Sequence, residues 1–193
     1  MNDKHNLLQI EVDDRTTLRE ITLDDVSDIF HTIDIQREYL EQWLPFVPFT
    51  KTINDSLAFV QSVLDAAPNQ AELVFTIRYN NAFAGLIGFK DTDRANRKTE
   101  IGYWLSEPLQ GKGIVTRSVK ALVRFAFDEL DINRIQIRCA VGNTPSKRIP
   151  QRLGFALEGL ERDGELLANG LFTNLEVYSL TNSDYITNKN HYT

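Results

Sequence analysis

The sequence predicts a mixed α/β fold in a single domain. Three observations support this: 193 residues suit one domain, 42% hydrophobic residues is an ordinary globular composition, and strand-like and helix-like patterns alternate along the chain. The chain shows no repeat, low-complexity tract or linker. We therefore expect one unit over residues 1–193, with a core at about 7–181 and a frayed polar tail at 182–193.

The charge balance argues against two classes of partner. The 21 basic and 27 acidic residues give a net charge of −6, which disfavours binding to nucleic acid or to an anionic membrane surface. No apolar run approaches the ~20 residues of a membrane helix, and the first residues lack a secretory pattern. Cys139 is the only cysteine, so no intrachain disulfide can form. We expect a cytoplasmic protein.

The first 50 residues predict two short strands, a helix and a stiff loop. Strand-like stretches lie within residues 7–20, on both sides of a turn. A helix begins at Thr22, because Thr followed three residues later by Asp25 approximates a capping box, and apolar residues continue at helical spacing to about Trp43. Two prolines then break the helix, so residues 43–49 form an apolar loop.

The next segment predicts a helix followed by a hairpin. Apolar residues at helical spacing indicate an amphipathic helix over residues 54–66, and Pro68 is its expected stop. Strand patterns then cover residues 73–77 and 83–89. The pair Asn80-Asn81 between them is typical of a tight hairpin turn.

A glycine-bearing loop is the most informative feature. The strand expected at 99–105 leads through Gln110-Gly111-Lys112-Gly113 into a helix that runs to about Leu130. Such a loop exposes main-chain N–H groups at the positive end of the helix dipole, which predicts an anion site, although the glycines can also serve only a tight turn. A P-loop is excluded because Ser106 stands where it needs glycine. A dinucleotide fingerprint is excluded because Thr116 stands where it needs glycine or alanine.

The last third predicts three strands and a short helix. A strand at 135–141 leads to a helix that begins near Asn143, a helix-capping residue, and ends at Gly154. Two final strands, 155–160 and 171–180, flank a polar turn.

Two kinds of reactive side chain predict no site of their own. Cys139 lies mid-strand among apolar neighbours, which favours a buried, inert thiol. The histidines are too scattered for a metal site or a nucleophile–base pair, so we expect no metal. These histidines are His5, His31 and His191.

Taken together, the motifs resemble the GCN5-related N-acetyltransferase (GNAT) family, and within it the branch that acetylates the N-termini of ribosomal proteins. The family's acetyl-CoA signature, Gln/Arg-x-x-Gly-x-Gly/Ala, is matched by Gln110 and Gly113, with Val115 in place of the last small residue. The resemblance runs from about Thr17 to Leu180. Further matching segments are Trp43-Leu44-Pro45, Ile101-Gly102-Tyr103-Trp104-Leu105, Val141-Gly142-Asn143-Thr144-Pro145-Ser146 and Arg152-Leu153-Gly154-Phe155.

The resemblance implies a fold and a cosubstrate. The implied fold is a single-domain GNAT fold, with a mixed, mostly antiparallel sheet, splayed central strands and helices on both faces. The implied cosubstrate is acetyl-CoA, with its pantetheine arm between the splayed strands and its pyrophosphate on main-chain N–H groups. Lys112 and Arg117 either reach the outer phosphate or are solvated, and Asn143 either contacts the arm or only caps its helix. The implied cofactor-binding residues are Trp104, Leu105, Gln110, Gly111, Lys112, Gly113, Ile114, Val115, Thr116 and Asn143.

The resemblance also implies an acid and a base. Many family members place a tyrosine acid where this chain has Pro150, whereas the ribosomal branch uses a serine one turn earlier, which is Ser146. The branch's glutamate base corresponds to Glu165, counted from the preceding helix end. Counting from the other side of the turn leads to Leu166, so neighbouring carboxylates stay open as the base. These carboxylates are Glu158, Glu161 and Asp163. That Glu165 is only a solvated turn residue is also an open alternative.

The acceptor is the least determined part. Trp43 stands in the branch's substrate-side segment, and a stiff apolar loop favours a peptide, so a protein N-terminus is the leading acceptor. A small amine such as a polyamine or an aminoglycoside is the alternative, and an acyl-CoA-binding domain without turnover is a second one. The branch's His-Asp pair is replaced by the stretch 172–174. The sequence leaves the oligomeric state open, including a homodimer.

Overall fold

An eight-stranded sheet forms the centre of the molecule, in the order β1-β2-β3-β4-β5-β6-β8-β7. The computed structural model describes residues 7–66 and 72–192, so His5 and the expected helix stop Pro68 lie outside the described residues. All neighbouring strands are antiparallel except β5 and β6, which confirms the predicted mixed, mostly antiparallel sheet. The strands are β1 (Gln9–Asp13), β2 (Thr16–Glu20), β3 (Val74–Tyr79), β4 (Ala82–Asp93), β5 (Lys98–Leu105), β6 (Arg134–Ala140), β7 (Ala156–Leu166) and β8 (Phe172–Thr181).

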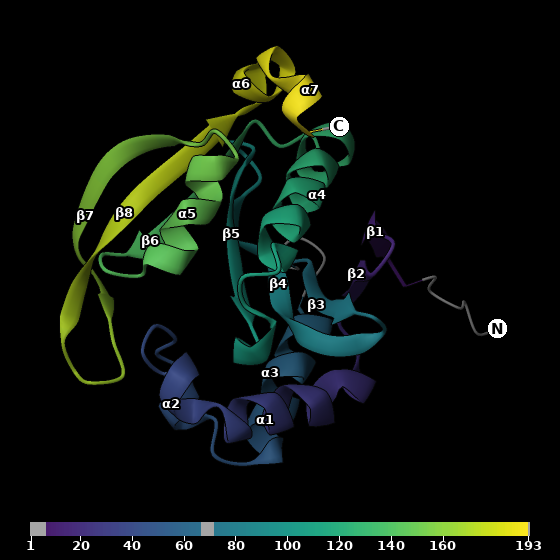
Figure 1. The fold of residues 1–193 in the computed structure, drawn as a ribbon, viewed down its shortest axis with the longest axis vertical. Helices are drawn as coiled ribbons and strands as arrows, with labels where there is room; N and C mark the ends of the chain where they lie inside the picture. Colours follow the sequence, from purple (N-terminus) through teal and green to yellow (C-terminus); the bar gives the residue numbers. More distant parts are fainter. Residues whose placement is uncertain (1–6, 67–71, 193) are drawn as a thin grey trace.

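Helices cover both faces of this sheet. Figure 1 shows α1 to α3 gathered at one end of the molecule, α4 and α5 along the sheet, and α6 and α7 at the opposite end. β7 and β8 form a long curved hairpin at one side (Figure 1). The helices are α1 (Val26–Ile35), α2 (Arg37–Leu40), α3 (Ile53–Leu64), α4 (Ile114–Glu129), α5 (Thr144–Arg152), α6 (Asn182–Thr187) and α7 (Lys189–Tyr192), with short 3₁₀ turns at Leu23–Asp25, Val47–Phe49 and Glu107–Leu109.

Each face of the sheet has its own hydrophobic core. The larger core joins the sheet to α4 and α5, and contains fully buried residues such as Val119, Leu122 and Ile137. The smaller core joins the sheet to α1 and α3, through residues such as Ile29 and Val60. The alternation of strand side chains between the two cores fixes which residues face which helices.

The first predicted helix is divided, so the expectation of one helix from Thr22 to Trp43 is wrong. The capping box of Thr22 and Asp25 is present, but it closes a 3₁₀ turn that leads into α1. α1 ends before Gln36, whose backbone (φ −130°, ψ 26°) departs from helical geometry before α2 begins. Bonds from the Gln36 amide to residues of another element, described below, hold the break.

The β3–β4 hairpin is as predicted. Asn80 and Asn81 have φ values of 50° and 65°, the left-handed pair that a tight two-residue hairpin turn requires. Asparagine tolerates this region better than most residues do.

The last hairpin is longer than predicted. The polar segment 161–166, expected as a turn, continues β7 and pairs with β8 as far as Leu166 and Phe172. Two irregularities, one of which includes Asp163 at φ 50°, absorb the extra residues. The sequence did not predict the full length of β7, because residues 156–163 are exposed on both faces and show no hydrophobic alternation.

The expectation of a frayed tail after Thr181 is also wrong. Residues 182–187 and 189–192 form α6 and α7, and a capping box of Thr181 and Asp184 begins the first. Tyr185 and Tyr192 are buried, and Tyr185 stacks on Phe127 of α4 with ring centroids 4.9 Å apart. Two aromatic side chains in a polar segment are enough to attach it to the core.

Candidate functional site

A gap opens in the middle of the sheet between β5 and β6. The two strands pair in parallel only up to Glu100 and Gln136, although β5 continues to Leu105 and β6 to Ala140. Beyond the last pair, the facing main-chain edges of the two strands do not bond to each other. This confirms the predicted splay of the central strands.

The N-terminus of α4 has the geometry of a main-chain anion site. Gly111 and Gly113 have φ values of 73° and 72°, a left-handed conformation that favours glycine. Gly113 is the N-cap of this 16-residue helix, and no side chain caps it. A Cβ on Gly111 would meet nothing within 4 Å, so the approach to the loop is open. The first-turn N–H groups therefore present their partial positive charge outward.

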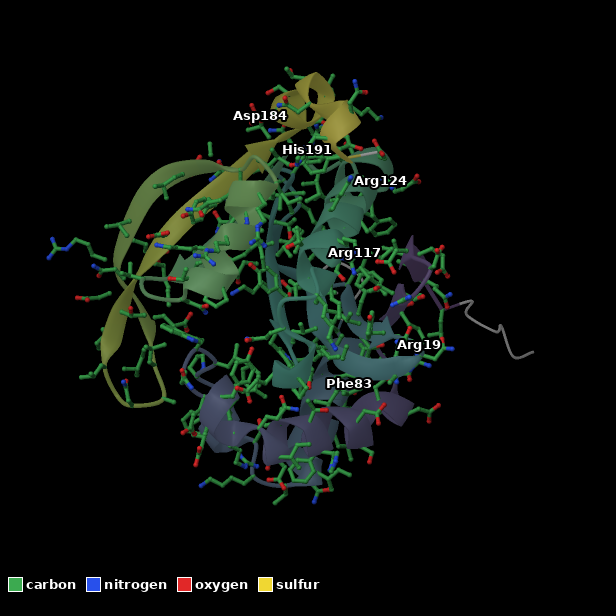
Figure 2. All side chains as sticks on the ribbon, viewed as in Figure 1. Arg19, Phe83, Arg117, Arg124, Asp184 and His191 are labelled. Carbon is green, nitrogen blue, oxygen red and sulfur yellow. The ribbon has the colours of Figure 1, made fainter. Side chains whose placement is uncertain are left out.

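Two basic side chains at this helix end already have partners. Arg117 of α4 reaches toward β1 (Figure 2), where it donates to the Asp13 carboxylate at 2.5 Å, and it also donates to the Lys112 carbonyl at 3.0 Å. The ammonium of Lys112 lies 5.8 Å from the centre of the Tyr79 ring, a cation–π distance. Neither side chain is simply solvated.

The loop before α4 is tied to the junction of α1 and α2. The Gln36 amide donates to the Ser106 hydroxyl at 2.9 Å and accepts from the Glu107 N–H at 2.8 Å. Gln110, expected at the cofactor, turns its side chain to the hydroxyl of Tyr39 on α2. These partners are about 70 residues apart in the chain, and no local pattern could have found them.

The hydroxyl of Ser146 lies between the parted strands. Its Oγ is 3.1 Å from the Tyr103 hydroxyl of β5 and 3.3 Å from the Cys139 sulfur of β6. Asn143 caps α5 by accepting the Ser146 N–H at 3.2 Å, as a capping residue should. The structure therefore brings together Ser146, Asn143 and Tyr103, of which sequence analysis missed Tyr103.

Burial keeps both neighbours of this serine protonated. Burial and the nearby Cys139 sulfur raise the pKa of the Tyr103 phenol far above its ordinary value. Burial raises the pKa of the Cys139 thiol to about 11. Cys139 is 2% exposed, so it is a buried thiol as expected.

Trp104 lies on β5 beside the gap, and Trp43 lies close to the turn that follows β6. The Trp43 ring comes within 3.4 Å of the position that a Cβ on Gly142 would take, so the loop after α2 reaches the turn that follows β6. The Trp104 side chain is buried in the smaller core beside Phe83, at 5.8 Å between ring centroids. Leu105 belongs to the larger core. Only main-chain groups of these two β5 residues are left to border the gap.

The candidate carboxylates differ in what they bind. Glu158 accepts from both guanidinium nitrogens of Arg134 at 2.6 Å and from Ser179 at 2.8 Å, which lowers its pKa to about 2. Glu161 pairs with Arg138 at 3.3 Å, and Asp163 is exposed. Glu165 is partly buried on β7, where its main chain pairs with Thr173, and within the described part of the chain its carboxylate makes no hydrogen bond or ion pair.

Sequence analysis also missed Glu100, a buried carboxylate at the fork of the gap. It is 2% exposed and accepts from Lys90 at 2.8 Å, Gln136 at 2.9 Å and Arg138 at 2.5 Å. These donors come from β4 and β6, so the carboxylate ties three strands together where β5 and β6 part. A carboxylate neutralised by two cations is a structural group rather than a base.

Residues 7–66 and 72–192 contain no group of three or more histidine, cysteine, aspartate or glutamate side chains that could hold a metal ion. No helix among them has the length and apolar character needed to span a membrane.

The split sheet, the glycine-led helix end and the hydroxyl in the gap define the class of GNAT-type acetyltransferases. The chain belongs to that family: the family's sequence model, described as "Acetyltransferase (GNAT) domain", matches residues 15–156. The protein is therefore an acetyltransferase.

Named relatives agree with the family. YdaF of Bacillus subtilis, named for ribosomal N-acetyltransferase activity, is 43% identical over 107 residues, which span 55% of this chain and only 58% of that protein. The ribosomal-protein-serine acetyltransferase of Escherichia coli is 28% identical over 88% of this chain and 94% of its own length.

Solved structures share the fold over nearly the whole chain. RimL, the ribosomal L7/L12 α-N-protein acetyltransferase, in complex with coenzyme A, superposes with a TM-score of 0.86 at 27% identity and covers 90% of this chain and 98% of its own. The microcin C7 self-immunity acetyltransferase MccE, in complex with acetyl-CoA and AMP, has a TM-score of 0.83 at 32% identity, over 88% and 94%.

Proposed function

We propose that the protein is an acetyl-CoA-dependent N-acetyltransferase whose acceptor is the N-terminal amine of a ribosomal or other protein. The observation that carries this proposal is the unpaired stretch of β5 and β6, where the Ser146 hydroxyl contacts one residue of each strand, together with the uncapped N-terminus of α4. The RimL and MccE complexes with coenzyme A and acetyl-CoA support it. We also propose that the protein acts in the cytoplasm.

In this proposal the cofactor binds largely through the main chain. The N–H groups from Gly111 to Thr116 hold the pyrophosphate, because they point outward from an uncapped helix end with open space before Gly111. The edge of β5 at Trp104 and Leu105 receives the pantetheine arm, and a main-chain N–H there polarises the thioester carbonyl. Lys112 supplies a nearby positive charge, and the Asn143 amide stands where the arm leaves the gap.

The reaction needs one base and one acid. The ammonium form of the acceptor loses one proton to Glu165, its nitrogen attacks the thioester carbon, and the second proton leaves that nitrogen to water as the amide forms. The carbon–sulfur bond then breaks with its electron pair on sulfur, and Ser146 gives its proton to the thiolate. An α-amino group has a pKa of about 8 and a thiol one of about 8.5, so each transfer is modest near neutral pH. Glu165 suits the base because no cation or donor in the described chain occupies its carboxylate.

The acceptor is placed on the side of the gap where Trp43 stands. Trp43 lies close to Gly142 in the turn after β6, and Phe49 in the same loop is 76% exposed. The β7–β8 hairpin also exposes two large apolar side chains, Leu171 and Phe172. Apolar walls of this kind reward an extended peptide more than a short polyamine.

A small amine remains the alternative acceptor, and MccE is the observation that favours it. That structure is of a self-immunity acetyltransferase bound to AMP rather than of a ribosomal enzyme, yet its identity to this chain, 32%, is higher than that of RimL, 27%. A domain that binds acetyl-CoA without turnover is the other alternative.

A thiol-release assay with acetyl-CoA separates these functions. The acceptor panel contains N-terminal peptides, the same peptides with blocked termini, spermidine and an aminoglycoside. We expect release with free-terminus peptides and none with blocked ones. A higher kcat/KM for spermidine or the aminoglycoside than for any peptide would show that the acceptor is a small amine. Calorimetric binding of acetyl-CoA without thiol release in the presence of any acceptor would identify a binding domain.

A further inference from the structure

Pro150 leaves one carbonyl of α5 without its helical donor. In an α-helix the carbonyl of residue i accepts from the N–H of residue i+4, so the Ser146 carbonyl would accept from residue 150. Proline has no N–H. Although Pro150 lies inside α5, the Ser146 carbonyl is therefore available to a donor from outside the helix.

The phenol of Tyr103 supplies that donor. Its hydroxyl donates to the Ser146 carbonyl at 3.2 Å, and the same oxygen is 3.1 Å from the Ser146 hydroxyl. Tyr103 comes from β5 and Ser146 from α5, so these contacts cross the mouth of the gap. One phenol thus holds both the main chain and the side chain of a single residue.

The hydrogen-bond donors and acceptors around Ser146 determine where its hydroxyl points. The phenol donates its hydrogen bond to the Ser146 carbonyl, so the phenol oxygen can accept one from the Ser146 hydroxyl. In the described chain, the only other near partner of that hydroxyl is the Cys139 sulfur at 3.3 Å, a weak acceptor. The high pKa of the phenol keeps its proton in place. A charged thiolate is a stronger acceptor than a phenol oxygen. The serine hydroxyl therefore turns toward the thiolate of coenzyme A when that thiolate forms.

We propose that Tyr103 is a positioning residue, which fixes the first turn of α5 and aims the Ser146 hydroxyl along the gap between β5 and β6. This rests on the proposed function, in which Ser146 protonates the departing thiolate of coenzyme A. In that step the carbon–sulfur bond breaks, the electron pair stays on sulfur, the serine proton moves to sulfur, and the serine regains a proton from water.

The test compares four proteins with the wild type: Tyr103→Phe, Ser146→Ala, the double variant, and Cys139→Ala. Cys139→Ala is the matched control because its sulfur, at 3.3 Å, is the other side-chain neighbour of the serine hydroxyl in the gap. We expect Tyr103→Phe to lower kcat at least tenfold, with KM for acetyl-CoA and affinity for CoA within twofold of wild type. The double variant should be no slower than Ser146→Ala, because Tyr103 acts through the serine. Cys139→Ala should keep kcat within twofold.

A fifth variant separates positioning from mere support of the helix. Pro150→Ala, added to Tyr103→Phe, returns an N–H to the Ser146 carbonyl without returning the phenol. We expect it to recover melting temperature but not kcat. Full recovery of kcat would show that Tyr103 only supports α5, and would overturn the proposal.

Other outcomes also overturn it, and they are distinguishable from failure of the proposed function. Unchanged kcat in Tyr103→Phe, multiplied losses in the double variant, or an equal loss in Cys139→Ala each contradict positioning by the phenol. Full activity in Ser146→Ala removes both the donor and its positioning residue, while acetyl transfer by the wild type still stands. A wild-type protein that releases no thiol with any acceptor contradicts the proposed function itself.

Discussion

Among the candidate carboxylates of β7, Glu165 differs from Glu158 and Glu161 because no arginine in the described chain binds its carboxylate. Glu158 and Glu161 bind arginines, and a carboxylate held by a guanidinium is a poor proton acceptor because its charge is already stabilised. Glu165 makes no such bond in the described chain. The sequence could narrow the candidate base to a short segment, but only the arginine partners, which come from β6, distinguish Glu158 and Glu161 from Glu165 and Asp163.

We predict that Glu165→Gln lowers kcat about 10²-fold or more near neutral pH, because it removes the proton acceptor and keeps the shape. The loss should shrink at high pH, where the amine is already deprotonated. Steady-state kinetics over a pH series measures both effects. Asp163→Asn, an exposed neighbour on the same strand, is the control and should stay within twofold. A Glu165→Gln protein with full activity would assign the base to water or to another carboxylate.

Gly113 has a steric role in addition to its conformation. Its φ is 72°, and a Cβ there would lie 2.7 Å from the Arg117 guanidinium, so any larger residue must displace the arginine from the Lys112 carbonyl. We predict that Gly113→Ala weakens CoA binding at least tenfold, roughly 1.4 kcal/mol, measured by calorimetry.

The matched control for Gly113→Ala is Gly154→Ala. Gly154 has a φ of 73°, and a Cβ on it would meet nothing within 4 Å, so the substitution adds the same left-handed strain without a clash. Both variants should lose about 1 kcal/mol of stability, but Gly154→Ala should keep CoA affinity within twofold. Equal affinities in the two variants would remove Gly113 from the cofactor site.

At the scale of the elements, the sequence predicted the features that interactions between nearby residues determine. The Asn80-Asn81 turn and the cap of α5 were predictable because the deciding interactions lie within a few residues of each other. The break at Gln36 was not, because its cause is a pair of bonds to Ser106 and Glu107, far along the chain. Tyr103 was missed for the same reason: only the fold brings α5 against β5.

The loop after α2 gives a prediction about the acceptor. Trp43 lies close to the turn after β6, and two prolines stiffen the loop, so a peptide can bind there with little loss of loop entropy. We predict that Trp43→Ala raises KM for a peptide N-terminus at least fivefold, roughly 1 kcal/mol, and leaves KM for acetyl-CoA within twofold. Circular dichroism verifies folding, and equal shifts in the two KM values would place Trp43 in general packing.

The C-terminal helices give a prediction about stability. Tyr192 is 1% exposed, donates to the Leu153 carbonyl and packs edge-on against Tyr185 at 5.3 Å between ring centroids. We predict that Tyr192→Ala lowers the free energy of unfolding by about 3 kcal/mol or more in urea. Ile186→Ala, at a residue that is 62% exposed on α6, should change it by less than about 0.5 kcal/mol. Equal effects would show that α6 and α7 contribute little to the core.

At the scale of the whole molecule, ionised carboxylates stabilise the fold above mildly acidic pH. Hydrogen bonds and nearby cations lower several carboxyl pKa values, and the largest effect is on Glu158. A lowered folded-state pKa contributes stability that is present above the unfolded-state pKa and is lost as pH falls. Other carboxyl groups with lowered pKa values are Asp13, Asp55, Asp93, Glu176 and Asp184.

We therefore predict a pH-dependent effect of Glu158→Gln. The bonds from Arg134 and Ser179 lower the pKa of Glu158 from 4.5 to about 2, so the variant should be less stable than wild type at neutral pH. The difference should narrow as pH falls from about 4.5 and should be nearly gone by about 2. Thermal unfolding across this range measures it. A difference that stays constant with pH would mean that packing, rather than charge, accounts for the loss.

The position of the two tryptophans has an optical consequence. The chain has only two, and Trp43 and Trp104 flank the same gap from the loop after α2 and from β5. Trp104 is buried beside Phe83, whereas Trp43 is partly exposed, so the two indoles differ in their contact with water. Intrinsic emission of the unmodified protein thus originates at the place where both substrates are proposed to meet. Arrival of an acceptor should shift the emission of Trp43 alone, which allows stopped-flow fluorescence to follow the order of binding without an attached label.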